Sequence, residues 1–241
     1  LDLILHDIHL SLFKNKKPNF SSIFFNAGAH IQHHYLHNSL ATNNRKNPSS
    51  YVSKNKDPFY EIIEFYDLIL GDYLDKQNCQ IILATGLTQK VTEKIEYYYR
   101  LRDHERFLRD NLSIKFKSVK PRMSRDFLII FNNNLERDEA FRLLKYLELN
   151  NQRLFHDIEI RNEELFVTMT YNSIIKKNDY ILFKGKQIFI FDEVSFVAIK
   201  NGEHMSKGYL YSKNNLDSSE NLLNNIHVKD IHNLILNYFV K

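Results

Sequence analysis

The sequence predicts an α/β fold of three layers, built on a mostly parallel sheet. Two observations predict it. Short apolar runs at residues 21–25 and 80–84 flank a long helical pattern at residues 59–76, and a strand, a helix and a strand in this order form a βαβ unit with parallel strands. The second run, QIILA, is apolar after its first residue, as in parallel strands that are buried on both faces.

The first segment, LDLILHDIHLSLF, predicts an amphipathic helix over residues 1–13. It has neither a charged start nor a small-residue cleavage site, so it is not a signal peptide. The chain begins without Met. We therefore keep two interpretations open: an ordinary N-terminal helix, or the C-terminal portion of a longer protein whose N-terminal part is missing here.

The next segments alternate between predicted loops and one strong helix. The His-rich stretch AHIQHHYLHNS follows the first predicted strand as a loop, and residues 41–56, rich in Asn, Ser and Lys, form an exposed loop. Asp57 and Pro58 then offer an N-cap and a proline at the first helical position. Apolar residues at helical spacing predict a helix over residues 59–76.

The second half of the chain has a different pattern. Residues 92–111 are highly charged and predict a solvated helix. The strand, helix, strand, strand series that follows resembles half of a ferredoxin-like unit, with elements at 126–131, 135–149, 153–160 and 165–171 and a hairpin turn at 161–164. Later strands are expected at 180–183 and 187–191, joined by Lys184-Gly185-Lys186, and at 196–199, with a closing helix at 228–239. The predicted organisation is a core at 1–112, an inserted βαββ subdomain at 113–175 and a return to the core at 176–241.

The composition of the 241 residues is that of a soluble globular protein, with 43% hydrophobic and 26% charged residues. It excludes a disordered chain, a collagen-like fibre and a disulfide scaffold. No apolar stretch is long enough to span a membrane. A single cysteine, Cys79, suits a reducing compartment, and we expect a cytoplasmic protein. The net charge of +4 gives only weak support for nucleic acid as a partner.

Histidines are the clearest candidate for chemistry. Four of the 11 histidines, His30, His33, His34 and His37, fall within one short segment. Imidazole is a common ligand of zinc and other transition metals, and open α/β sheets place their sites at the carboxyl ends of strands. The alternative is a polar loop that happens to carry histidines. A metal shared by His6 and His9, or nucleic-acid binding by the basic run at residues 115–125, is less favoured than solvent exposure.

At this segment the sequence resembles a known family. KPNFSSIFFNAGAHIQHHY resembles the part of the alkaline phosphatase superfamily, in its type I phosphodiesterase and nucleotide pyrophosphatase branch, that reads Lys-Pro-Asp, a strand and Asp-x-x-x-His. QIILATGLTQ stands where that family has a Ser-Asp-His-Gly strand. NGEHMSKGYL resembles its Gly-x-His loop, and VKDIHNLILNYF resembles its closing helix. The resemblance covers roughly two thirds of the chain and implies an alkaline-phosphatase-like fold that acts on phosphate or sulfate esters with two metal ions.

Several ligand positions of the family are substituted in this chain. If His33 is the matching histidine, Ala29 replaces the Asp; in the other register Asn26 and His30 form the pair. Ala84 and Thr85 replace the ligands of the second metal. The nucleophile lies before the aligned segment. The resemblance therefore implies at most one divalent ion, zinc or manganese, held by a subset of five residues: His33, His204, His30, Asn26 and His34.

Two functions remain in view. The first is a metal-dependent, phosphoesterase-like hydrolase or phosphoryl transferase with an incomplete metal centre, acting on a small phosphate or sulfate ester. The alternative is a catalytically eroded module that binds an anionic ligand or a protein partner. The lost acids at positions 29 and 84 favour the alternative, and the remaining histidines favour the hydrolase.

Overall fold

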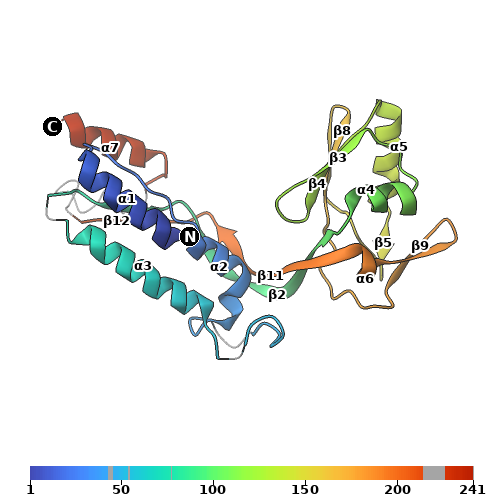
Figure 1. The fold of residues 1–241 in the computed structure, drawn as a ribbon, viewed down its shortest axis with the longest axis horizontal. Coiled ribbons are helices and arrows are strands. Elements are labelled where there is room, and N and C mark those ends of the chain that lie inside the picture. Colours follow the sequence, from blue (N-terminus) through green and yellow to red (C-terminus); the bar gives the residue numbers. More distant parts are fainter. Residues whose placement is uncertain (43–45, 54, 77, 214–225, 241) are drawn as a thin grey trace. The chain divides into compact units, whose positions relative to one another are not determined.

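The computed structural model describes residues 1–42, 46–53, 55–76, 78–213 and 226–240 (Figure 1). The chain divides into two compact units. Unit 1 comprises Leu1–Glu93 and Asn201–Lys241, and unit 2 comprises Lys94–Lys200. The predicted insert at 113–175 lies within unit 2. Both connections between the units run inside strands, β2 (Thr88–Leu101) and β11 (Val194–Met205), which pair with each other.

The prediction of a three-layer fold with a mostly parallel, alkaline-phosphatase-like sheet is wrong. The described strands form small sheets, the largest of four strands, and six of their strand pairs are antiparallel. Residues 21–25 form no strand, and β1 (Ile82–Thr85) pairs antiparallel with β12 (Tyr209–Ser212). An apolar run indicates a strand but carries no information on its direction, which here is decided by a partner from the far end of the chain.

The described part of unit 1 contains four α-helices: α1 (Asp2–Lys16), α2 (Ala27–Tyr35), α3 (Pro58–Leu74) and α7 (Asp230–Val240). Three of them confirm predicted helices. At α3 the Asp57 carboxylate accepts the Tyr60 N–H at 2.9 Å, as the N-cap prediction requires. Among the described residues, no helix is long and apolar enough to span a bilayer.

The fourth helix, α2, replaces the predicted His-rich loop and is followed by one 3-10 turn, η1 (Leu36–Asn38). Its first N–H groups are capped from other helices rather than locally. The buried Asp2 carboxylate accepts the Ala27 N–H at 2.9 Å, and the Tyr66 hydroxyl accepts the Gly28 N–H at 2.7 Å. A Cβ at Gly28 would lie 2.6 Å from the Tyr66 ring, so only glycine permits this approach. Such distant caps leave no local sequence signal.

Unit 2 contains a four-stranded antiparallel sheet in the order β3-β4-β8-β7. Its strands are β3 (Ser118–Pro121), β4 (Asp126–Ile130), β7 (Ile158–Arg161) and β8 (Glu164–Thr168), and α5 (Asn134–Lys145) follows β4. The order β4, α5, β7, β8 is the predicted βαββ series, and the hairpin with Arg161 opposite Glu164 confirms the predicted turn. The small pair β5 (Glu148–Leu149) and β6 (Gln152–Arg153) lies between α5 and β7.

The rest of unit 2 surrounds one large apolar cluster. A second hairpin pairs β9 (Tyr180–Phe183) with β10 (Lys186–Phe189), as predicted. Short helical turns lie earlier, at α4 (His104–Arg106) and η2 (Phe107–Asn111), and directly after β10, at α6 (Ile190–Glu193). The predicted helix at 92–111 is wrong over its first half, which belongs to β2. The alternate residues Tyr97, Tyr99 and Leu101 pack in or against the cluster, as expected of a strand. The charged residues of the same segment conceal this period of two in the sequence.

Candidate functional site

Four histidine side chains lie together in unit 1, and we call them the histidine cluster: His30, His33, His34 and His204. Three of them come from α2 and His204 comes from β11. The ring centroids of His33 and His204 are 4.6 Å apart, and those of His30 and His34, one helical turn apart, are separated by 4.8 Å. His33 and His34 are 6.2 Å apart. The cluster is therefore a continuous series of imidazole contacts.

The orientation of His33 is defined by the backbone of β11. His33 Nδ1 lies 3.3 Å from the carbonyl oxygen of Gly202. A carbonyl can only accept a hydrogen bond, so Nδ1 carries the proton and donates. In the neutral ring the lone pair is then on Nε2. Metal-binding histidines are commonly oriented in this way, with one ring nitrogen donating to a carbonyl while the other holds the ion.

Glycine at position 202 allows β11 to approach α2 closely. A Cβ at Gly202 would lie 2.8 Å from the carbonyl oxygen of Gln32 and would also meet the side chain of Gln89. Gln89, on β2, donates through Nε2 to the Ala29 carbonyl at 3.0 Å. These contacts hold α2 against both strands, so the relative positions of His33 and His204 depend on backbone packing.

A buried amide pair supports the same region. Asn47 and Asn201 exchange two side-chain hydrogen bonds of 2.8 and 2.9 Å, and Asn201 is fully buried. The Asn201 Oδ1 also accepts the His37 N–H at 2.8 Å, and the His37 ring lies 3.0 Å from Thr92 Oγ1. His37, the fourth histidine of the sequence segment, is thus part of a structural network. Nothing in the spacing of Asn47 and Asn201 predicts their pairing.

The remaining predicted ligand positions lie apart from these ring contacts. Asn26 is exposed at the start of α2, where its backbone carbonyl accepts the His30 N–H at 3.1 Å. Ala84 and Thr85 are in β1, and Thr85 Oγ1 accepts the Tyr209 N–H at 2.8 Å. Among the described residues, no group of three or more His, Cys, Asp or Glu side chains is arranged to hold a metal ion.

His6 and His9 have structural partners between α1 and α3. His6 is buried, and its Nε2 is 2.9 Å from the Asp72 carboxylate. His9 contacts the hydroxyls of Tyr73 and Ser21 at 2.8 and 2.6 Å. Burial, and next the nearby His6, lower the pKa of His9. Both rings therefore join α1 to α3. The solvent exposure expected for these residues is wrong for His6, which is buried.

The comparisons with known proteins add no relative. No family model, curated protein or solved structure matches this chain. Membership of the alkaline phosphatase superfamily stays a prediction that rests on the sequence motifs.

Proposed function

We propose that unit 1 binds one divalent ion, zinc or manganese, through His33 and His204. The ion would bind a phosphate or sulfate ester for hydrolysis or phosphoryl transfer. The observation that carries this proposal is the ring contact at 4.6 Å between these two histidines. One lies on α2 and the other on β11, far apart in the sequence. Imidazoles brought together from distant elements are a common way to build a metal site.

The orientation of His33 supports the proposal independently. Its Nδ1–H donates to the Gly202 carbonyl, which leaves Nε2 as the nitrogen that can coordinate an ion. Two neutral imidazoles also leave the full positive charge of the ion in place. When bound, the ion would supply a Lewis acid that polarises an ester oxygen and attracts the anionic group.

The residues fit such an ion only in part. Zinc sites in enzymes generally have three protein ligands and one water, whereas the described residues offer no group of three. We therefore expect an open site in which water and ester oxygens complete the coordination. Its affinity for metal should be lower than that of a zinc site with three histidines, and it should fall as pH drops, because protonated imidazole cannot coordinate.

Metal content of the purified chain tests the proposal. We expect about one zinc or manganese ion per chain by mass spectrometry after dialysis, and we expect the ion to be lost in both His33→Ala and His204→Ala. His156→Ala is the matched control, because His156 is exposed in unit 2. Hydrolysis of a generic phosphomonoester and of a phosphodiester should then follow the metal content through the same three variants.

A second function is favoured by the substituted positions. Ala29 and Ala84 carry no ligand atom in their side chains, and the Thr85 hydroxyl is bound to a backbone N–H in the β1–β12 pair. These features suit a module that binds an anionic ligand without turnover. A folded, metal-free wild type, or a metal-loaded one without hydrolysis, would contradict the hydrolase and favour this module.

A further inference from the structure

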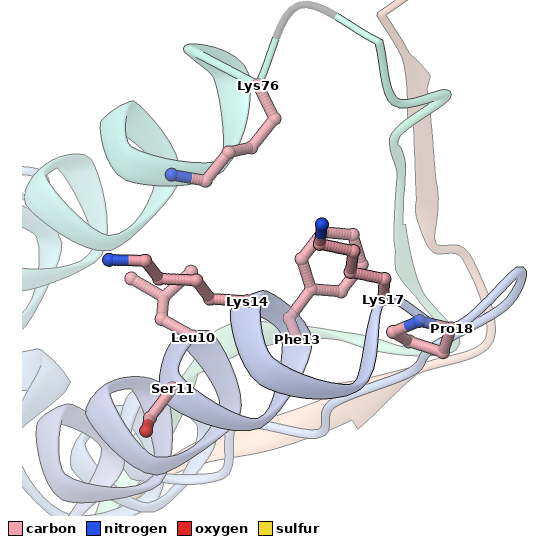
Figure 2. Close-up of a pocket in the computed structure, with 7 residues that line it drawn as sticks. All are labelled: Leu10, Ser11, Phe13, Lys14, Lys17, Pro18 and Lys76. Carbon is pink, nitrogen blue, oxygen red and sulfur yellow. The ribbon is translucent and has the colours of Figure 1, made fainter.

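A cavity of about 710 Å³ lies in unit 1, at the C-terminal ends of α1 and α3 (Figure 2). Its volume is within the range of sites that bind small organic molecules. Seven residues line it: Leu10, Ser11, Phe13, Lys14, Lys17, Pro18 and Lys76. They come from the last turns of α1, the two residues after it and the second residue beyond α3. None of the predicted metal ligands is among them.

The cavity carries three lysines and no acidic residue. Among the residues that the structure describes, none forms an ion pair with Lys14, Lys17 or Lys76. Elsewhere in the same unit, lysines have partners, as in the Lys90–Glu203 pair at 2.8 Å. Three like charges around one cavity repel one another, and a bound anion would remove that repulsion.

The negative end of α3 does not account for this group of lysines. Lysine side chains are often attracted to the last carbonyls of a helix. At α3, however, a different lysine does this: the Lys213 ammonium donates to the Leu74 carbonyl and, at 3.0 Å, to the Lys76 carbonyl. Lys14 is in the last turn of α1 and Lys17 ends it, where the helix dipole favours cations. The dipole does not explain why Lys76 lines the same cavity.

Lys17 adopts a backbone conformation that usually selects glycine. It ends α1 with φ +45°, in the left-handed region, while its N–H donates to the Phe13 carbonyl at 2.9 Å. Glycine or asparagine is the common residue at such a helix end, since other side chains are strained there. Strained residues are found preferentially at ligand sites. Here the strain coincides with a side chain that lines the cavity.

The other lining residues are mainly apolar. Leu10, Phe13 and Pro18 contribute aliphatic and aromatic surface beside the three ammonium groups. A small inorganic anion would leave this surface and most of the volume without contacts. An anion attached to a flat apolar group would use both, because its ring can pack against Phe13 while its charge meets the lysines.

We propose that this cavity is a binding site for an aryl or similar apolar organic anion, with a phosphate or sulfonate as its charged group. The site is separate from the histidine cluster and does not rest on the proposed function. Lys14, Lys17 and Lys76 bind the charged group, and the apolar residues bind the ring.

Calorimetric titration of the full chain with 1-naphthyl phosphate, in the presence of EDTA, tests the proposal. Replacing all three lysines with glutamine should weaken binding about tenfold or more. The matched control replaces Lys115, Lys117 and Lys120 with glutamine, which removes the same charge from unit 2 and should leave the affinity unchanged. Inorganic phosphate and 1-naphthol should each bind about tenfold more weakly than the complete probe.

Four outcomes would overturn the proposal. Equal weakening by both triple variants would mean a general attraction to positive charge. Equal affinity for inorganic phosphate would remove the role of the apolar residues. Loss of binding in a His33→Ala, His204→Ala double variant would move the ligand to the histidine cluster. No binding to the wild type would show that the cavity does not bind an organic anion of this class. Should the triple variant not fold, Lys76→Gln alone should still weaken binding measurably.

Discussion

Unit 2 buries a continuous cluster of aromatic and aliphatic side chains, whereas unit 1 buries mainly polar ones. In the described part of unit 1 the buried apolar residues are Leu36, Val52 and Ile69, beside buried polar residues such as Asp2, His6, His37, Asn47 and Asn201. Burial of apolar surface is non-directional and tolerates small shifts. Hydrogen bonds are directional and costly to leave unmade. The candidate sites therefore lie in the unit whose geometry depends on a few specific hydrogen bonds.

The largest expected effect is in the core of unit 2. Phe127 is fully buried, and its ring contacts Phe155 at 5.8 Å and His104 at 4.9 Å. Phe127→Ala should lower the free energy of unfolding by about 3–5 kcal/mol. Urea denaturation, followed by amide exchange in each unit, measures the loss. Leu135→Ala, at an exposed position on α5, is the control. A similar loss in both variants would mean that the cluster is not the stabilising core.

The second prediction concerns a buried histidine within that apolar core. Burial, and then the positive charge of Arg100, lower the pKa of His104 to about 4. Between pH 6.5 and 4 the unfolded chain binds a proton that the folded chain does not, so stability is present above pH 6.5 and is lost as pH falls. The loss should approach about 3 kcal/mol at pH 4.

Denaturation of the wild type and of His104→Gln over this pH range checks the effect. The variant should lose the acid-dependent part, and His156→Gln, at an exposed position, should keep it. An unchanged pH profile in His104→Gln would assign the acid sensitivity to other groups.

The third prediction addresses the polar interior of unit 1. Asn201→Ala removes the partner of the Asn47 amide and of the His37 N–H. We expect a loss of about 2–3 kcal/mol, because buried polar groups are left without their bonds. Amide exchange in unit 1 measures it, and Asn15→Ala, exposed on α1, is the control. The ring nitrogen signals of His33 should also change, since Gly202 is the next residue. No change in either measurement would contradict a network that positions the histidine cluster.

The smallest expected effect is a gain in stability. Lys17→Gly removes the strain of a left-handed lysine and should raise the free energy of unfolding by up to about 1 kcal/mol. Lys16→Gly, inside α1, should instead destabilise by a similar amount. Thermal denaturation compares the two variants. Lys17→Gly should also weaken the binding of 1-naphthyl phosphate, because it removes one of the three cavity lysines. A loss of stability would contradict the assigned strain.

Local signals explain which elements the sequence could predict. Asp57 and Pro58 define the start of α3 within a few residues, and alternating patterns define the hairpin at Arg161 and Glu164. The start of α2 depends instead on Asp2 and Tyr66, which no local window contains. The prediction of parallel strands failed for the same reason, because the partner of β1 is β12, near the far end of the chain.

The candidate sites also differ in how far the sequence could predict them. The family resemblance groups His33 with His204, and their rings lie 4.6 Å apart. The amide pair of Asn47 and Asn201 and the lysine-lined cavity arise from tertiary packing. Neither has a spacing that sequence reasoning could recognise.

The paired strands β2 and β11 have a consequence for how this gene can change. The chain crosses the boundary of the units once on each strand, and the two strands are hydrogen-bonded neighbours. Lys90 and Glu203 form an ion pair in unit 1, and Glu96 and Lys200 form one in unit 2. Deleting unit 2 would therefore leave two adjacent strand ends that a short turn can join. The whole of unit 2 could be gained, lost or exchanged as a cassette while the histidine cluster and the cavity stay encoded in the flanking sequence.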